Sequence, residues 1–200
     1  MGPVELRRRL WHIGPGLLPF LLWNIPHADP ISPTLRWIVV GATVAIATAI
    51  FLKFHLIQRR GENGRLGQIA GYAGAVLGTV LLFPRHLELG MAVLAILAFG
   101  DGMATLFGLV VGGPRLAWNR AKTWAGTASF VLIGGATASV IYWREAQPAV
   151  SFATALACGM AGAFVAGIAE SLPSRINDNI RVGLAAALTL AAMHGWLVGW

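Results

Sequence analysis

The sequence has little charge and almost no cysteine. Only 12% of its 200 residues are charged and 56% are hydrophobic, whereas about a quarter of the residues in a soluble domain are charged. The mean hydropathy of +0.69 is too high for an ordinary water-facing surface. The single cysteine, Cys158, excludes a disulfide framework and a cluster of thiolate metal ligands.

Several common catalytic motifs are also missing. Ala121 stands immediately before Lys122, so the Gly-Lys of a P-loop is absent, and Gly100-x-Gly102 lacks the third glycine of a dinucleotide-binding loop. Neither His-Glu-x-x-His nor Gly-x-Ser-x-Gly occurs, so the sequence gives no support to zinc-protease or α/β-hydrolase chemistry.

Long apolar runs are what the chain has in abundance. Each is long enough to cross roughly 30 Å of hydrocarbon as a helix. They predict an all-α, polytopic transmembrane bundle of about seven spans. No linker or internal repeat divides the chain, so we expect residues 1–200 to form one integral-membrane domain. In a prokaryotic cell, this domain would lie in the inner or plasma membrane. The runs are Leu10–Ile25, Trp37–Ile57, Leu66–Phe83, Leu87–Val111, Trp124–Trp143, Ala149–Ser171 and Ile180–Trp200.

The basic residues predict orientation and not nucleic-acid binding. The net charge is +7, but the cations are dispersed among short loops and form no single patch. If the N-terminus is cytoplasmic, outside loops hold only Arg36, Arg85 and Arg144, and the other 12 of the 15 Lys and Arg residues lie inside. This asymmetry follows the positive-inside rule and predicts a cytoplasmic N-terminus. Met1–Asn24 is similar to a signal peptide, but no small-x-small cleavage site follows it in residues 25–29, so we interpret it as the first helix.

Asp101 is the first candidate functional residue. It lies in Phe99-Gly100-Asp101-Gly102-Met103-Ala104, inside an apolar run where a charge costs about 3 kcal/mol even on the gentler insertion scales. We therefore expect Asp101 to face protein, water or a ligand. The adjoining Gly102 could unwind the helix at this point.

A second polar group lies at the start of the chain. Glu5, Arg8 and His12 stand at positions i, i+3 and i+7, so they share one face if the segment is helical. The alternative is a basic flank that anchors the first helix.

A cationic loop precedes the fifth apolar run. Lys122 and Thr123 come immediately before a predicted helix N-terminus, where free N–H groups and a lysine favour phosphate. The alternative is a positive-inside loop in which Thr123 only caps the next helix.

A third polar group lies at the end of the sixth run and just after it. Glu170-Ser171-Leu172-Pro173 and Asn177-Asp178-Asn179 offer the carboxylate and amide oxygens that Mg²⁺ accepts, although a plain turn favours the same residues. Combined with Asp101 and Lys122, they suggest Mg-nucleotide chemistry on a lipid substrate, since phosphoryl transfer needs mainly positioning and charge neutralisation.

Taken in order, these motifs resemble those of the family of phytol kinases, dolichol kinases and CTP-dependent diacylglycerol kinases, which is similar to the integral-membrane phosphatidate cytidylyltransferases. The resemblance runs from Glu5 to about Leu184. It implies an all-helical membrane enzyme that uses CTP, or another nucleoside triphosphate, and Mg²⁺ to phosphorylate a lipid alcohol, with its active site facing the cytoplasm.

The resemblance also implies roles for individual residues. Asp101 and Asp178 would hold the metal, Lys122 would contact phosphate, and Glu170 would complete the acidic set. His12 would line the site, and a carboxylate or His12 would position the substrate hydroxyl. Nucleotide-binding residues would be Arg8, Gly100, Gly102, Lys122, Thr123, Gly126, Asn177 and Asn179. Two positions depart from the family pattern, which often has Glu in place of Ala125 and Asp in place of Asn177.

The sequence thus predicts a phosphotransferase acting on an isoprenoid alcohol such as phytol or a polyprenol. The alternatives are a phosphatidate cytidylyltransferase, a CTP-dependent diacylglycerol kinase and, outside the enzymes, a small transporter. A transporter would show polar residues on both sides of the midplane and repeated halves, and the sequence shows neither feature.

Overall fold

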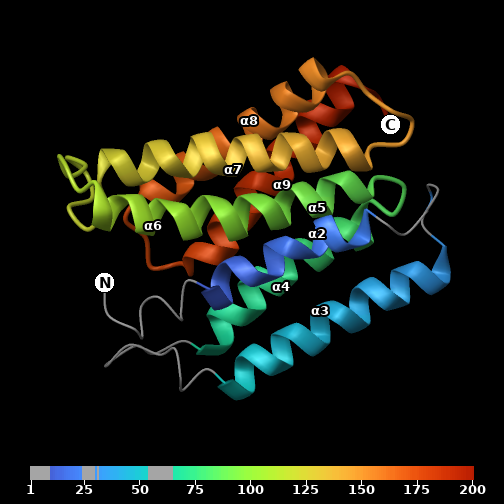
Figure 1. Ribbon diagram of the computed structural model, residues 1–200, viewed down its shortest axis with the longest axis horizontal. Helices are drawn as coiled ribbons and strands as arrows, with labels where there is room; N and C mark the ends of the chain where they lie inside the picture. The colour runs from blue at the N-terminus through green and yellow to red at the C-terminus, as the bar shows by residue number, and fades with distance from the viewer. Residues whose placement is uncertain (1–9, 24–29, 31, 54–64) are drawn as a thin grey trace.

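The computed structural model describes residues 10–23, 30, 32–53 and 65–200, and this part of the chain is all-α (Figure 1). A short opening helix begins at Leu10 and continues through η1 (Gly14–Leu17) and α2 (Leu18–Leu22). The remaining elements are α3 (Pro33–Lys53), α4 (Arg65–Leu82), α5 (Leu87–Ala95), η3 (Ile96–Gly100), α6 (Asp101–Val110), α7 (Trp124–Glu145), α8 (Phe152–Ser171) and α9 (Asp178–Leu197).

Each of the seven predicted apolar runs overlaps one of these helical segments. Five segments are long and apolar enough to cross a membrane: α3, the continuous stretch Leu87–Val110, α7, α8 and α9. Two are shorter apolar helices, Leu10–Leu21 and Ile69–Leu82. The described chain is therefore built as a multi-pass membrane protein, and the side of the membrane on which each terminus lies stays a prediction.

The stretch Leu87–Val110 forms the centre of the bundle. Every residue of α5 is buried, and this stretch lies beside α7, with α8 and α9 behind them (Figure 1). In contrast, α3 lies at the edge of the bundle (Figure 1), and only 11% of its most apolar window is buried. A buried central helix can hold a polar group away from lipid, as the position of Asp101 requires.

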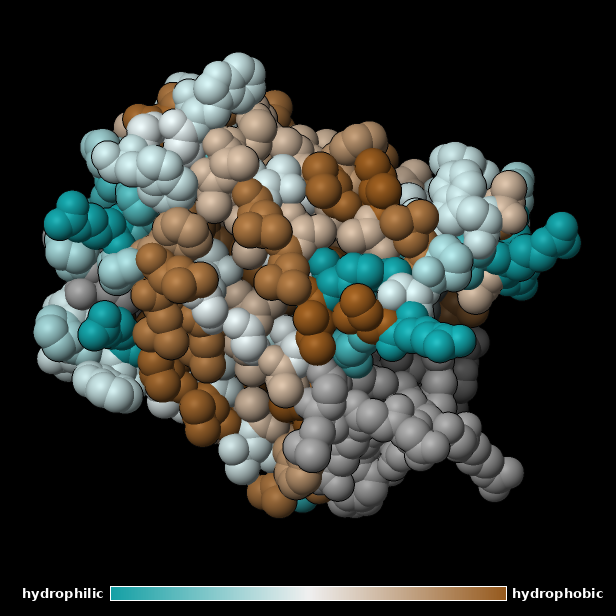
Figure 2. Space-filling view, turned by 180° about the vertical axis from the view of Figure 1, so that it is seen from behind, coloured by the Kyte–Doolittle hydropathy of each residue, from teal (hydrophilic) through white to brown (hydrophobic). Residues whose placement is uncertain are grey.

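The surface agrees with a membrane setting. Figure 2 shows apolar side chains over the middle of one face, whereas many of the strongly hydrophilic ones lie toward its two sides. Large apolar side chains are freely exposed on several helices, among them Trp37, Leu132, Leu184 and Leu188. In water such a surface would favour association, but in a bilayer it faces lipid.

The central helix changes its winding immediately before Asp101. Ile96–Gly100 is a π-helical turn, and the Asp101 N–H donates to the Ala98 carbonyl where a regular α-helix would use Leu97. Single π-helical turns are frequent at functional sites. The sequence placed the distortion at Gly102, and this was wrong: Gly102 lies within α6. A β-carbon at Gly102 would lie 2.5 Å from Cγ1 of Ile13, so this glycine allows the opening helix to approach.

Candidate active site

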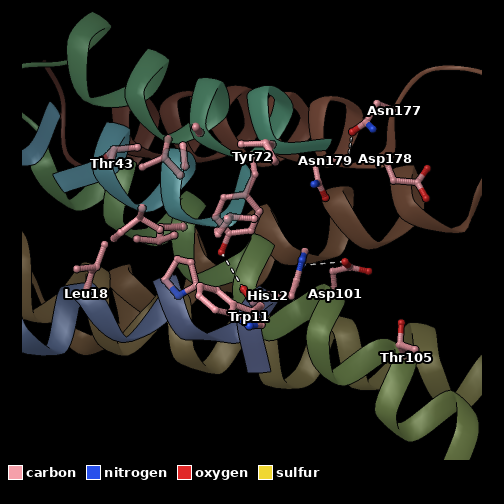
Figure 3. Close-up of a pocket in the computed structure, with 18 of the residues that line it drawn as sticks. Trp11, His12, Leu18, Thr43, Tyr72, Asp101, Thr105, Asn177, Asp178 and Asn179 are labelled. Atoms are coloured by element: carbon pink, nitrogen blue, oxygen red, sulfur yellow. Dashed lines mark hydrogen bonds and ion pairs between the residues drawn. The ribbon is translucent and has the colours of Figure 1, made fainter. Parts of the chain in front are cut away.

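A cavity of about 530 Å³ lies between the opening helix, α3, α4, α6 and the start of α9 (Figure 3). One part of its wall is polar and the rest is largely apolar. The polar residues include His12, Tyr72, Asp101, Thr105, Lys122, Asn177, Asp178 and Asn179, and the apolar ones include Pro15, Leu18, Ile46, Ala47, Ile50, Ile69, Ala73, Val76, Leu94 and Leu109. This size is typical of sites for small organic molecules.

His12 and Asp101 form a pair in the cavity wall (Figure 3). The His12 Nε2 atom lies 2.9 Å from the Asp101 Oδ2 atom and 3.0 Å from the Leu97 carbonyl oxygen. Both neighbours accept hydrogen bonds, so Nε2 carries the proton. The Leu97 carbonyl is the one that the π-helical turn diverts from the Asp101 N–H, so the helix distortion and the histidine contact belong together.

Tyr72 holds the other side of His12. Its hydroxyl donates to the His12 backbone carbonyl at 3.4 Å, and the two rings meet edge to face with their centres 5.3 Å apart. Tyr72 comes from α4 and Asp101 from α6, so His12 is fixed from two helices. The side chains of His12 and Asp101 are 19% and 24% exposed, which leaves both accessible from the cavity.

Lys122 is the cation of the site. Its ammonium is hydrogen-bonded to the Glu170 carboxylate, which is only 3% exposed, and its Nζ atom lies 4.0 Å from the Asp178 Oδ2 atom. Burial lowers the pKa of Lys122, but the charge of Glu170 and its hydrogen bond, together with Asp101 and Asp178, raise this pKa above its ordinary value overall. Lys122 is therefore protonated at neutral pH, and it carries its charge between three carboxylates.

The loop before α7 is fastened to the end of α8. The Asn119 Nδ2 atom donates to the Ser171 carbonyl at 3.1 Å, and the Trp118 indole N–H donates to the Ser171 hydroxyl at 3.3 Å. Glu170 precedes Ser171, so these bonds hold the lysine loop against the carboxylate that pairs with Lys122. The loop is thus positioned by these two hydrogen bonds as well as by the ion pair of Lys122 with Glu170.

In the segment Asn177-Asp178-Asn179, Asp178 is the first residue of α9. Asn177 caps this helix, because its side-chain oxygen accepts from the Asn179 N–H at 3.0 Å. The Asp178 Oδ1 atom accepts a 2.8 Å hydrogen bond from Arg181, whose second nitrogen donates to the Leu172 carbonyl at 2.8 Å. Asp178 is 55% exposed, so it is a carboxylate with room for a further ligand.

The structure divides the predicted site residues into two groups. His12, Asp101, Lys122, Asn177, Asp178 and Asn179 line one cavity. Others lie behind it and shape the wall. Glu170 holds Lys122, and Thr123 caps α7 by accepting from the Gly126 N–H at 3.1 Å. The nucleotide-binding roles of Thr123 and the glycines remain predictions.

The glycines of these motifs permit close approach of helices. A β-carbon at Gly126 would lie 2.7 Å from the Ala104 carbonyl oxygen, and one at Gly100 would meet the Phe130 ring at 3.1 Å. Glu5 and Arg8 lie outside the described residues, so the predicted face shared with His12 stays a prediction.

Sequence reasoning missed Tyr72 and Arg181 as parts of this site. Tyr72 is one of only two tyrosines, and a hydroxyl inside an apolar run was the available signal, since a buried Tyr usually has a polar partner. Arg181 follows Asp178 by one helical turn, the spacing of an i, i+3 ion pair. Arg181 can pair with Asp178 in this way only because α9 begins at Asp178, which places both residues in its first turn.

The fold and the site together define a class: a multi-pass helical membrane protein in which one cavity joins an apolar wall to a cluster of carboxylates, a lysine and a histidine. No family model and no solved structure matches the sequence. Curated plant proteins do match. The chain is 28% identical over 207 residues to phytol kinase 1, chloroplastic, of Arabidopsis thaliana, covering 96% of this chain and 67% of that protein.

Two further relatives give the same result. Identity is 29% over 206 residues to a probable phytol kinase 1, chloroplastic, of Glycine max, with coverage of 90% and 64%. It is 28% over 210 residues to a probable phytol kinase, chloroplastic, of Zea mays, with coverage of 92% and 65%. The chain thus spans about two thirds of the length of these relatives. The chain is thus similar in sequence to these phytol kinases, and the resemblance predicted from the ordered motifs is confirmed.

Proposed function

We propose that this protein is a membrane kinase that transfers the γ-phosphate of CTP, or of another nucleoside triphosphate, to an isoprenoid alcohol such as phytol or a polyprenol. The observation that carries the proposal is a cavity whose wall is apolar along α3 and α4 and polar at His12, Asp101 and Lys122. An alcohol with a long hydrocarbon chain likewise has an apolar chain and one polar end. The similarity to proteins named phytol kinases supports the same reading.

The apolar wall would take the isoprenoid chain. Leu18, Ile46, Ile50 and Val76 provide aliphatic surface, and burying a chain against them stabilises the complex by roughly 25 cal/mol per Å² of apolar area. The substrate hydroxyl would then lie near the His12–Asp101 pair. Which isoprenoid alcohol is used depends on how far this wall extends.

The polar end would take the triphosphate and a divalent cation. Asp101, Asp178, Asn177 and Asn179 line one cavity, and their carboxylate and amide oxygens are the donors that Mg²⁺ accepts, so these residues fit a magnesium ion. When bound, Mg²⁺ would neutralise phosphate charge. The two aspartates are the predicted metal ligands.

The protein groups would act mainly by position and charge. Lys122 would neutralise negative charge that develops on the transferred phosphoryl group, the type of stabilisation on which phosphoryl transfer depends. His12 donates its Nε2 proton toward Asp101 and so orients this carboxylate. A carboxylate or His12 would position the substrate hydroxyl and accept its proton.

The positive-inside pattern supports a cytoplasmic location for this end of the bundle. The polar end includes Lys122, and the loop before α7 also carries Arg115 and Arg120. Cytoplasmic loops are enriched in such residues. A cytoplasmic site would also have direct access to nucleoside triphosphates.

A product assay with differently labelled CTP tests the proposal. Purified protein is incubated with Mg²⁺, CTP labelled at the α- or γ-phosphate, and a mixture of prenols, diacylglycerol and phosphatidate. The proposal expects γ label in a prenyl phosphate and no α label in any lipid, with Asp101→Asn as the inactive control. Label from the α position would indicate cytidylyl transfer to phosphatidate, and γ label in diacylglycerol alone would indicate a diacylglycerol kinase. Absence of label from every lipid would overturn the enzyme assignment.

A further inference from the structure

A second polar cluster lies in the part of the bundle where α5 begins and α9 ends. His86 precedes α5, Glu88 lies in its first turn and His194 lies in the last turn of α9. Glu88 is separated from Asp101 by roughly 20 Å along the central helical stretch, at about 1.5 Å per residue. None of these three residues lines the cavity of the candidate active site, so the cluster is independent of the proposed kinase function.

The three side chains converge on one point. The Glu88 Oε1 atom lies 3.1 Å from the His86 Nδ1 atom and 3.5 Å from the His194 Nδ1 atom. One ligand atom from each residue lies within 4.8 Å of the other two. Atoms bound to a tetrahedral zinc ion at about 2.0–2.2 Å lie roughly 3.3–3.6 Å apart, so the two separations from Glu88 are close to those of a zinc site.

Burial makes an ionised Glu88 dependent on a nearby positive charge. The side chains of Glu88 and His194 are 1% and 2% exposed, and an ionised carboxylate in such a place needs a compensating charge. A proton on one histidine could supply it. However, the centres of the two imidazole rings are only 4.2 Å apart, so protonating both would place like charges together. If only one ring is protonated, the other contributes no charge to the pairing with Glu88. A single divalent ion engages all three groups at once.

The surroundings hold the cluster in place. The Tyr142 hydroxyl from α7 lies 2.5 Å from the His194 Nδ1 atom, and the Trp200 ring lies against both histidines, with centre separations of 5.5 Å to His86 and 5.2 Å to His194. The Trp200 ring restricts the rotation of both imidazoles, whereas the tyrosine hydroxyl contacts the same His194 nitrogen that faces Glu88. An ion bound at this nitrogen would displace the hydrogen bond from Tyr142. His86, with 15% of its side chain exposed, is the side from which an ion would enter.

We propose that His86, Glu88 and His194 bind one zinc ion, which links the start of α5 to the end of α9. Two imidazoles and one carboxylate form a ligand set that zinc accepts readily, whereas Mg²⁺ prefers an all-oxygen shell. The ion would be structural, because it joins segments distant in sequence and lies away from the predicted catalytic groups. It would stabilise the folded state over the unfolded state, in which the ligands are dispersed.

Metal content and thermal stability of the whole chain test this site. The protein is purified in detergent with a tag that contains no histidine, treated with EDTA, incubated with excess Zn²⁺ or Mg²⁺ and desalted. We expect one zinc per chain by mass spectrometry and a rise in Tm on the order of 5 °C or more with Zn²⁺, with neither effect for Mg²⁺. Zinc below one tenth per chain together with an unchanged Tm would overturn the proposal.

Variants locate the bound ion. His86→Asn changes the most exposed ligand and should fold, lose the zinc and lose the Zn²⁺-dependent rise in Tm, and His194→Asn should do the same. His12→Asn removes a histidine from the candidate active site and should keep the full zinc content. Full zinc retention by His86→Asn, or loss of zinc in His12→Asn with retention in His86→Asn, would contradict the assignment. None of these readouts uses kinase activity, so a failure here is distinct from a failure of the proposed reaction.

Discussion

The His12 Nε2 atom lies 2.9 Å from the Asp101 Oδ2 atom and at the same time 3.0 Å from the Leu97 carbonyl. One histidine therefore joins the acidic residue of the central helix to the backbone of the π-helical turn that precedes it. The contact brings together the polar group at the start of the chain, which contains His12, and the segment that contains Asp101. It also fixes the direction in which the Asp101 carboxylate points.

Replacing Asp101 by Asn tests whether this residue holds Mg-nucleotide. The amide keeps the size of the side chain and still accepts a hydrogen bond from His12, but it removes the charge that a hard cation requires. We expect turnover to be lost while membrane insertion and detergent Tm are preserved. If Asp101 is only structural, the reverse holds: activity persists and Tm falls. Measuring both quantities on one purified variant separates the two cases.

His12→Gln tests positioning by the histidine. The variant loses the imidazole that orients Asp101, so we expect the kcat to fall by about tenfold, the cost of roughly 1.4 kcal/mol, with a smaller change in the KM for CTP. Leu97→Ala, which keeps the backbone carbonyl, serves as a control for simple packing loss. An unchanged kcat in His12→Gln would remove His12 from the site.

Lys122→Met should raise the KM for the nucleotide or lower kcat by at least about tenfold, since a charge-assisted hydrogen bond contributes roughly 1.5–3 kcal/mol. This change also leaves Glu170 buried without its cation, which costs stability. The double variant Lys122→Met with Glu170→Gln removes both charges and should recover Tm without recovering activity. Recovery of activity in the double variant would assign Lys122 a purely structural role.

The pH dependence of this pair follows from the raised pKa of Lys122. A lysine whose pKa is higher in the folded state contributes stability that is present below the ordinary value of about 10.4 and is lost only as pH rises through the higher folded value. We therefore expect the difference in Tm between the wild type and the double variant to be constant from pH 8 to pH 9. A difference that titrates in this range would contradict the pairing.

Narrowing the apolar wall tests where the hydrocarbon chain lies. Ala73 lines the cavity, so Ala73→Phe should raise the KM for a long prenol at least severalfold and leave the KM for CTP unchanged. Ala136, exposed on α7, gives the matched control Ala136→Phe, which should alter neither constant. Equal effects of Ala73→Phe on both substrates would indicate a general disturbance of the fold.

Reporter fusions test orientation. A reporter after Trp200 should be non-cytoplasmic, and one inserted between residues 61 and 65 should be cytoplasmic, because 12 of the 15 basic residues fall on one side of the seven-span arrangement. A cytoplasmic C-terminus would contradict this arrangement and would place the two ends of the bundle the other way round.

The sequence by itself determined the helices and the order of the motifs. Apolar runs long enough to span a bilayer correctly located the seven helical segments, because hydropathy is a local property of consecutive residues. Capping is local too: Thr123 accepts from the Gly126 N–H, as a threonine immediately before a helix predicts. The same locality explains why the ordered motifs identified relatives of the chain.

Only the tertiary structure decided which polar groups meet. The π-helical turn at Ile96–Gly100 rotates the helix ahead of Asp101, and the pairing of Lys122 with Glu170 depends on how the loop before α7 packs on the end of α8. Glu88 and His194 are likewise brought together across the bundle. Such contacts depend on the rotation and approach of whole helices, and helices in lipid pack through small residues and polar contacts, which no window of consecutive residues contains.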